Sequence, residues 1–162
     1  MPRLRFPFAF AAALSLVAMP AVSAAQEVGE AQQRAIEQAI HAVQGELRQA
    51  AGKLDADALF AWVLDTGMPP IIEDGLVHAS RAAALANTAA GFRGLSAISY
   101  AYTREHLSVL SPTLVLAVGE GTAHATLTDG RQIEAPFAET ILFALRDGAW
   151  KVLHAHRSAP SR

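Results

Sequence analysis

The pattern of hydrophobic and polar positions changes from helical to strand-like a little past the middle of the chain. Between residues 27 and 50, apolar side chains recur at steps of three and four, which places them on one face of a helix. The members of this stripe are Ile36, Ile40, Val43 and Leu47. Two further helices are predicted, over 56–65 and from 81 to about 90. Asp55 and Ser80 precede them, and both residue types cap helix N-termini well.

Beyond residue 94 the alternation of apolar and polar residues is typical of strands. The predicted strands span 95–110, 113–128, 131–146 and 149–158. Asp-Gly dipeptides at 129–130 and 147–148 predict tight turns, so the last three strands form an antiparallel meander. Asp74-Gly75 predicts a short hairpin over 71–77 in the same way. Helices followed by a run of strands predict an α+β fold, with the helices packed on one face of a curved sheet.

The first 25 residues have the three parts of a secretory signal peptide. Arg3 and Arg5 supply the positive charge, residues 6–19 are apolar, and Pro20 ends the apolar run. The alternative is an uncleaved membrane anchor. That run is shorter than the roughly 20 residues that a spanning helix needs, which favours the signal peptide.

Small residues at 22–25 predict cleavage after Ala24 or Ala25. The mature chain is then one domain over 26–158, with a loose tail over 159–162. The sequence therefore predicts a periplasmic or secreted protein that is not attached to a membrane after cleavage.

Composition narrows the classes of chemistry and partner. The chain has 162 residues, no cysteine and a net charge of −2. Without Arg3 and Arg5 the mature chain keeps 11 basic against 15 acidic residues, a net charge of −4. A mildly acidic domain gives no electrostatic reason to expect nucleic acid as a partner. The absence of cysteine excludes disulfides, a thiol nucleophile and a thiolate metal site.

Four stretches of sequence carry a resemblance to a known family. They are the ending Asp147-Gly148-Ala149-Trp150-Lys151-Val152-Leu153-His154-Ala155-His156-Arg157-Ser158, the segment Asp55-Ala56-Asp57-Ala58-Leu59, the turn Glu73-Asp74-Gly75, and the pair Ser80-Arg81. Together they resemble the nuclear transport factor 2-like superfamily, and within it the SnoaL-like branch.

The resemblance implies a cone-shaped fold, in which a strongly bent antiparallel sheet wraps around a pocket and three helices close one side. It also implies a homodimer formed through the sheet. The superfamily includes isomerases, cyclases, hydratases and dimeric assembly modules, so fold alone does not give function. The resemblance does not locate the catalytic base of the isomerase-type members on this chain.

Glu139 is the first candidate for chemistry. Strand alternation places it on the same face as Phe137, Ile141 and Phe143. A carboxylate among apolar side chains is suited to general acid–base catalysis. The alternative is that Pro136 or a bulge shifts the alternation and turns Glu139 toward water.

Tyr100, Tyr102, Arg104 and His106 share one face of the strand predicted over 95–110. Tyrosine hydroxyls and arginine commonly orient ligands in small pockets, and Arg104 is a candidate to hold a carboxylate, from Glu139 or from a ligand. Alternatively, this face is a polar outer surface or a dimer interface.

His154 and His156 share a face of the last strand with Trp150 and Val152. His156 is the second candidate for proton transfer, and His154 for the pocket wall. Zinc would need a third ligand that the spacing does not supply, so no metal or other cofactor is predicted. The third ligands considered are His78, His124 and Glu139.

Three function classes follow. The first is an exported domain that binds a small, largely apolar molecule in its cone, with or without catalysis. The second is a cofactor-free isomerase, cyclase or dehydratase, in which Glu139 or His156 moves a proton and Tyr100 or Tyr102 stabilises the oxyanion. The third is a homodimeric assembly or partner-binding domain.

Trp62 is assigned to the core or to the pocket wall.

Overall fold

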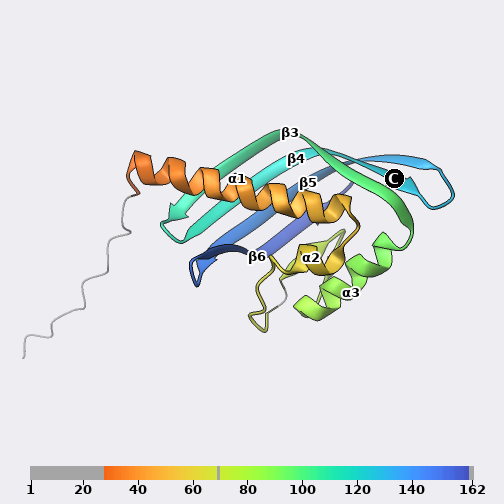
Figure 1. The fold of residues 1–162 in the computed structure, drawn as a ribbon, viewed down its shortest axis with the longest axis horizontal. Coiled ribbons are helices and arrows are strands. Elements are labelled where there is room, and N and C mark those ends of the chain that lie inside the picture. The colour runs from red at the N-terminus through yellow and green to blue at the C-terminus, as the bar shows by residue number, and fades with distance from the viewer. Residues whose placement is uncertain (1–27, 69, 161–162) are drawn as a thin grey trace, which may run out of the picture.

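The computed structural model describes residues 28–68 and 70–160 (Figure 1). The predicted signal peptide and the last two residues of the predicted tail lie outside the described residues. The elements are α1 (Glu30–Gly52), α2 (Ala56–Phe60), β1 (Ile71–Glu73), β2 (Leu76–Val77), α3 (Arg81–Phe92), β3 (Leu95–Ser111), β4 (Leu114–Leu127), β5 (Gln132–Arg146) and β6 (Ala149–Ser158).

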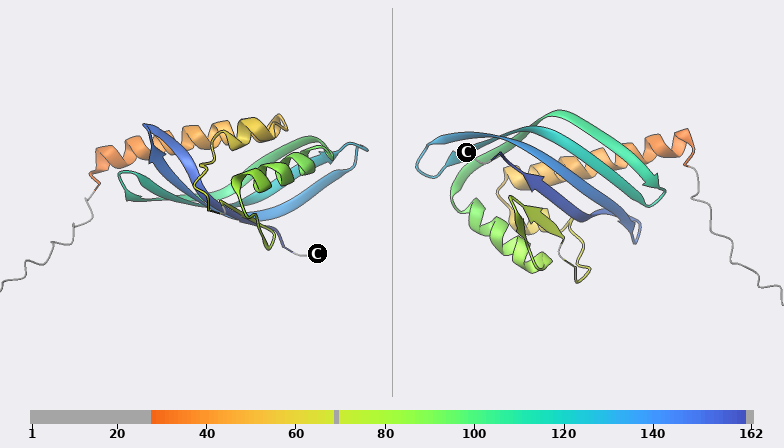
Figure 2. Two further views of the ribbon diagram at one scale, coloured as in Figure 1. Left: turned by 90° about the horizontal axis from the view of Figure 1, so that it is seen from below. Right: turned by 180° about the vertical axis from the view of Figure 1, so that it is seen from behind.

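The six strands form one bent sheet in the order β2-β1-β6-β5-β4-β3. All neighbouring strands are antiparallel except β1 and β6, which run parallel. The predicted hairpin and meander are both present. The helices lie on one side of the sheet, and no helix of the described residues covers its other side (Figure 2). The predicted α+β architecture is confirmed.

The hydrophobic core lies between α1 and the concave face of the sheet. The predicted stripe of α1 faces it: Ile36, Ile40 and Val43 are buried, and Leu47 packs at its border. The sheet contributes buried side chains from three strands. These are Val115 and Ala117 from β4, Ile141 and Phe143 from β5, and Trp150 and Val152 from β6. No helix in the described part of the chain is both long and apolar enough to cross a membrane.

The predicted caps are present, but α2 is shorter than predicted. The side chain of Asp55 accepts from the Ala58 N–H at 2.9 Å, and that of Ser80 from the Ala83 N–H at 3.1 Å. The helix α2 ends at Phe60, because the following residues pair with β6 instead. The Val152 N–H donates to the carbonyl of Trp62 at 2.8 Å. At its other end, α3 continues to Phe92, two residues past the predicted end.

Two irregularities in the sheet decide which side chains reach its concave face. In β3 the pairing with β4 shifts between Tyr102 and Arg104. In β6 the pairing with β5 shifts between Val152 and His154. Each shift inserts one extra residue, and side chains beyond it exchange faces. Both bulges lie beside the candidate site.

Candidate functional site

The concave face of the sheet and the three helices enclose a cavity of about 440 Å³. Most of its wall is apolar, including Leu47, Phe60, Ile71, Phe92, Ile98 and Ile141. Polar side chains come from the sheet, from α1 and from α3, which contributes Asn87 and Thr88. A concave, mainly apolar cavity with a few convergent polar groups is the usual form of a small-molecule site.

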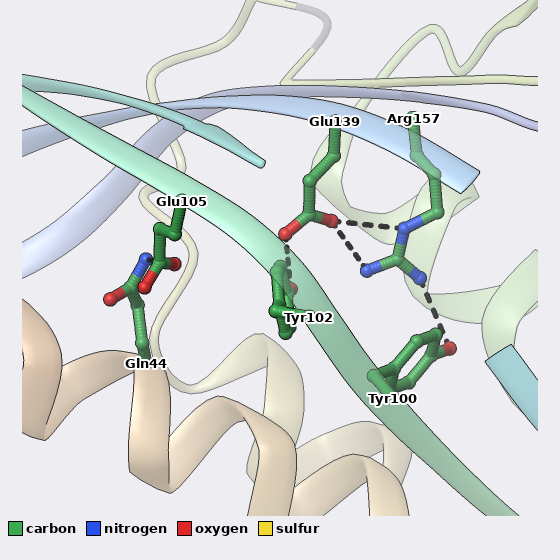
Figure 3. A network of polar contacts seen from close by, with 6 residues as sticks. All are labelled: Gln44, Tyr100, Tyr102, Glu105, Glu139 and Arg157. Carbon is green, nitrogen blue, oxygen red and sulfur yellow. Dashed lines mark hydrogen bonds and ion pairs between the residues drawn. The ribbon is translucent and has the colours of Figure 1, made fainter. Parts of the chain in front are cut away.

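Four side chains of the sheet form a polar network in the cavity wall (Figure 3). The Tyr102 hydroxyl donates a short hydrogen bond to Oε1 of Glu139. Arg157 donates to Oε2 of Glu139 from Nε at 3.0 Å and from Nη2 at 2.6 Å. Its Nη1 donates to the Tyr100 hydroxyl at 3.0 Å. The network therefore runs from Tyr102 through Glu139 and Arg157 to Tyr100.

Glu139 points into the cavity because β5 pairs with β4 without any register shift. Alternation along β5 is therefore intact, and Pro136 does not disturb it. The Glu139 side chain is 5% exposed. Its charge is balanced by Arg157, whose guanidinium lies 4.5 Å from the ring centre of Tyr100. The alternative in which Glu139 faces water is excluded, whereas its catalytic role stays a prediction.

The two tyrosines have different hydrogen-bonding states. The hydroxyl proton of Tyr102 is used in the bond to Glu139. The Tyr100 hydroxyl oxygen accepts from Arg157, and no atom in the described part of the chain accepts the Tyr100 proton. Tyr100 therefore offers a free donor, which a nearby cation polarises. Of the two candidates for an oxyanion-stabilising group, only Tyr100 has a proton to give.

The prediction that Arg104 lines the pocket is wrong, and the bulge in β3 is the reason. Tyr100 and Tyr102 point inward, but the extra residue at Thr103 reverses the alternation. Arg104 is exposed and its Nη2 lies 3.1 Å from Oε1 of Glu120. His106 is likewise exposed. Arg157, not Arg104, holds Glu139.

The placement of both candidate histidines is also wrong, because of the bulge in β6. Trp150 and Val152 face the core as predicted, but Leu153 is the extra residue. Beyond it the inward side chains are those of Ala155 and Arg157. His154 and His156 therefore lie on the other face of the sheet. Neither lines the cavity, so neither reaches a ligand bound there.

Trp62 belongs to the border of the core and does not line the cavity. The Nζ of Lys151 lies over its ring, 4.6 Å from the ring centre. Among the described residues, no three histidine, aspartate or glutamate side chains gather as metal ligands. His124, one of the third ligands considered for zinc, instead contacts Glu134 at 3.1 Å.

Sequence reasoning missed six polar side chains of the cavity wall, which are Gln44, Arg48, Glu73, Asn87, Thr88 and Arg157. Simple alternation along β6 places Arg157 on the outer face of the sheet. The extra residue at Leu153 turns its side chain into the cavity instead. Gln44 and Arg48 come from α1, next to its apolar stripe. Gln44 is buried and donates to Oε1 of Glu105 at 2.6 Å (Figure 3). A polar residue directly beside a helical stripe is the signal that could have identified both helix positions.

Burial, and then the Glu139 carboxylate beside it, raise the pKa of Tyr102 well above its usual value near 10. For Arg157, burial alone would lower the pKa, but Glu139 and the two tyrosine hydroxyls hold it above its ordinary value. Both shifts have the same consequence at neutral pH. Tyr102 is neutral and Arg157 is charged, so the network keeps the protonation states that its hydrogen bonds require.

The chain has two tyrosines, so a single substitution isolates the ionisation of Tyr102. In an alkaline titration followed by tyrosinate absorbance, we expect Tyr102→Phe to remove an absorbance change that occurs above pH 10. In the unfolded chain the Tyr102 hydroxyl ionises at a pH of about 10. It therefore stabilises the fold fully below that pH, and its contribution falls as the pH rises further. If the signal that Tyr102→Phe removes ionises near pH 10, before unfolding, this prediction is wrong.

Residues 40–162 match the family model of the SnoaL-like domain. The chain therefore belongs to the SnoaL-like family. No curated protein is similar enough to the chain to count as a match.

Solved structures of the nuclear transport factor 2-like fold superpose on most of the chain. A proposed dehydratase of that family from Streptomyces avermitilis is 17% identical, with a TM-score of 0.70 over 80% of this chain and 99% of its own. A proposed scytalone dehydratase from Novosphingobium aromaticivorans is 12% identical, with a TM-score of 0.74 over 82% and 89%. A hexachlorocyclohexane dehydrochlorinase of the LinA type from Novosphingobium barchaimii is 16% identical, with a TM-score of 0.66 over 82% and 92%. At these identities the likeness concerns the fold.

Proposed function

We propose that this chain is an exported protein that binds a small, largely apolar molecule in the cavity between its sheet and helices. The observation that carries the proposal is the cavity itself. It has about 440 Å³ of space, a mainly apolar wall and a hydrogen-bonded polar network in that wall. A domain that serves only assembly needs no such space, because side chains would fill it.

The polar network favours a ligand with a hydrogen-bond acceptor, such as a carbonyl oxygen. Tyr100 has a free hydroxyl proton. Arg157 has five N–H groups, and its contacts to Glu139 and Tyr100 use three of them. The Tyr100 O–H and the two unused N–H groups of Arg157 therefore remain as hydrogen-bond donors without an acceptor among the described residues. A ligand oxygen there would gain charge-assisted hydrogen bonds, while its apolar body lies against the wall.

A second candidate is proton transfer beside a carbonyl, with Glu139 as base and Tyr100 as oxyanion donor. The buried carboxylate near a free hydroxyl favours it, and relatives of the fold carry dehydratase and dehydrochlorinase names. The hydrogen bonds weigh against it. Both oxygens of Glu139 already accept from Tyr102 or Arg157, and three hydrogen bonds leave about one lone pair to take a proton from a ligand. We therefore rank binding ahead of turnover.

Export and a homodimer complete the proposal. Export is supported by the charged, apolar and small-residue segments that open the sequence. The dimer is supported by the uncovered face of the sheet, where Val118 and Leu110 are exposed at 46% and 51%. Exposed apolar side chains on a face without helices favour contact with a second copy.

Binding is tested with the neutral fluorophore N-phenylnaphthylamine on wild type and on two variants. Ile98→Trp adds a bulky ring to the cavity wall, and we expect it to raise the Kd by at least about tenfold, since overpacking leaves no room for the probe. Ile133→Trp is the matched control, because Ile133 is exposed and does not line the cavity. Equal binding by both variants would overturn the proposal. Native mass spectrometry of the same samples reports the subunit number and any ligand retained from the cell.

A further inference from the structure

We propose that the cavity selects organic anions, and that Arg48 is the residue that recognises the negative group. The ligand class is a small molecule with an apolar body and one carboxylate-like or sulfonate-like group. This inference rests on the proposed binding function and adds the charge of the ligand, which the network of Glu139 does not determine.

Arg48 is the cation of the cavity wall that lacks an acidic partner. It belongs to α1, where Gln44, Leu47 and Ala51 also line the cavity. Its guanidinium lies 5.6 Å from the centre of the Tyr102 ring. No carboxylate among the described residues forms an ion pair with it. Arg157, in contrast, is held on both edges by Glu139 and Tyr100.

The acidic residues near the cavity are committed elsewhere or lie on its other side. Glu139 is neutralised by Arg157. Glu105 accepts from Gln44 and lies 3.7 Å from Nδ1 of His41. Glu73 belongs to β1, in register with Arg157 of β6, and three strands separate β1 from the β3 strand that carries Tyr102. None of these three carboxylates therefore pairs with Arg48, and its charge stays available to a ligand.

The geometry of Arg48 suits recognition of an anion. A guanidinium that stacks on an aromatic face keeps its N–H groups at its edges free for two parallel hydrogen bonds to an oxyanion. Leu47, its neighbour in α1, and Ile98 of β3 supply apolar wall on the same side of the cavity. A ligand can thus place its charge at Arg48 and its apolar body inside. Because Arg48 is solvent-exposed, we expect a gain of about tenfold in affinity and no more.

The test compares two fluorophores with the same aromatic body, anilinonaphthalene sulfonate and neutral N-phenylnaphthylamine. Wild type is expected to bind the sulfonate about tenfold more tightly than the neutral probe. Arg48→Gln should remove this preference, because it raises the Kd of the sulfonate about tenfold more than that of the neutral probe. Arg34→Gln is the matched control, since it removes the same charge from an exposed position of α1 outside the cavity. It should keep the preference.

The outcomes separate this inference from the function on which it rests. Binding of both probes with equal affinity, or a preference that survives in Arg48→Gln, overturns the role of Arg48 and leaves the binding site standing. Binding of neither probe, or binding that Ile98→Trp does not weaken, overturns the proposed function and this inference with it.

Discussion

Replacing Gly121 with alanine is expected to reduce the free energy of unfolding by about 3 kcal/mol, the upper part of the range for overpacking in a filled space. A Cβ atom at this position would lie 2.2 Å from the carbonyl oxygen of Ala101 and 2.9 Å from Cα of Tyr102. Both are backbone atoms of the neighbouring strand and cannot rotate away. The alanine would push β3 away from β4 beside the bulge, at the point where Tyr102 contacts Glu139. Urea unfolding followed by circular dichroism measures the loss.

Two other glycines serve as controls for this prediction. Gly45→Ala, within α1, meets no atom within 4 Å and should stabilise the protein by about 0.5 to 1 kcal/mol, since alanine is the better helix former. Gly119→Ala would place its Cβ 3.0 Å from Cε1 of Tyr102. That ring can tilt, so we expect a loss near 1 kcal/mol. Equal stability of Gly121→Ala and Gly45→Ala would show that β3 and β4 leave room for a Cβ atom at position 121.

The elements of this fold follow closely from sequence, because each depends on local chemistry. The stripe of α1, the caps Asp55 and Ser80, and the Asp-Gly turns act within a few residues, and the structure contains all of them. The exception is the end of α2. There Trp62 and Val63 leave the helix to pair with β6, a partner about ninety residues away in the chain. No local pattern carries that information.

In β3 and β6 the candidate site was predicted correctly up to the bulge beside the site and wrongly beyond it. Glu139 lies on β5, whose pairing with β4 has no shift, and it was placed on the correct face. Tyr102 precedes the bulge of β3 and Arg104 follows it. His156 follows the bulge of β6. Because the side-chain period is two, one inserted residue exchanges the faces, and the need for a bulge arises from the bend of the whole sheet.

Arg157→Met is expected to destabilise the protein by about 2 to 3 kcal/mol at neutral pH. Removing one partner of a fully buried ion pair costs roughly 3 to 5 kcal/mol, and the value here is lower because the Arg157 side chain is 32% exposed. Methionine keeps an unbranched chain but loses the guanidinium, which lies 4.5 Å from the ring centre of Tyr100 and 5.4 Å from that of Phe137. The main change is that Glu139 keeps its charge and loses the partner on Oε2. Thermal and urea unfolding measure the effect.

A second variant separates the loss of charge pairing from a loss of packing. Adding Glu139→Gln to Arg157→Met should recover about half of the loss or more, since no buried charge then remains. A packing defect would persist in the double variant. If the deficit behaved in that way, Glu139 would reach water in solution, and the cavity wall would not be the closed network from which the ligand site was argued.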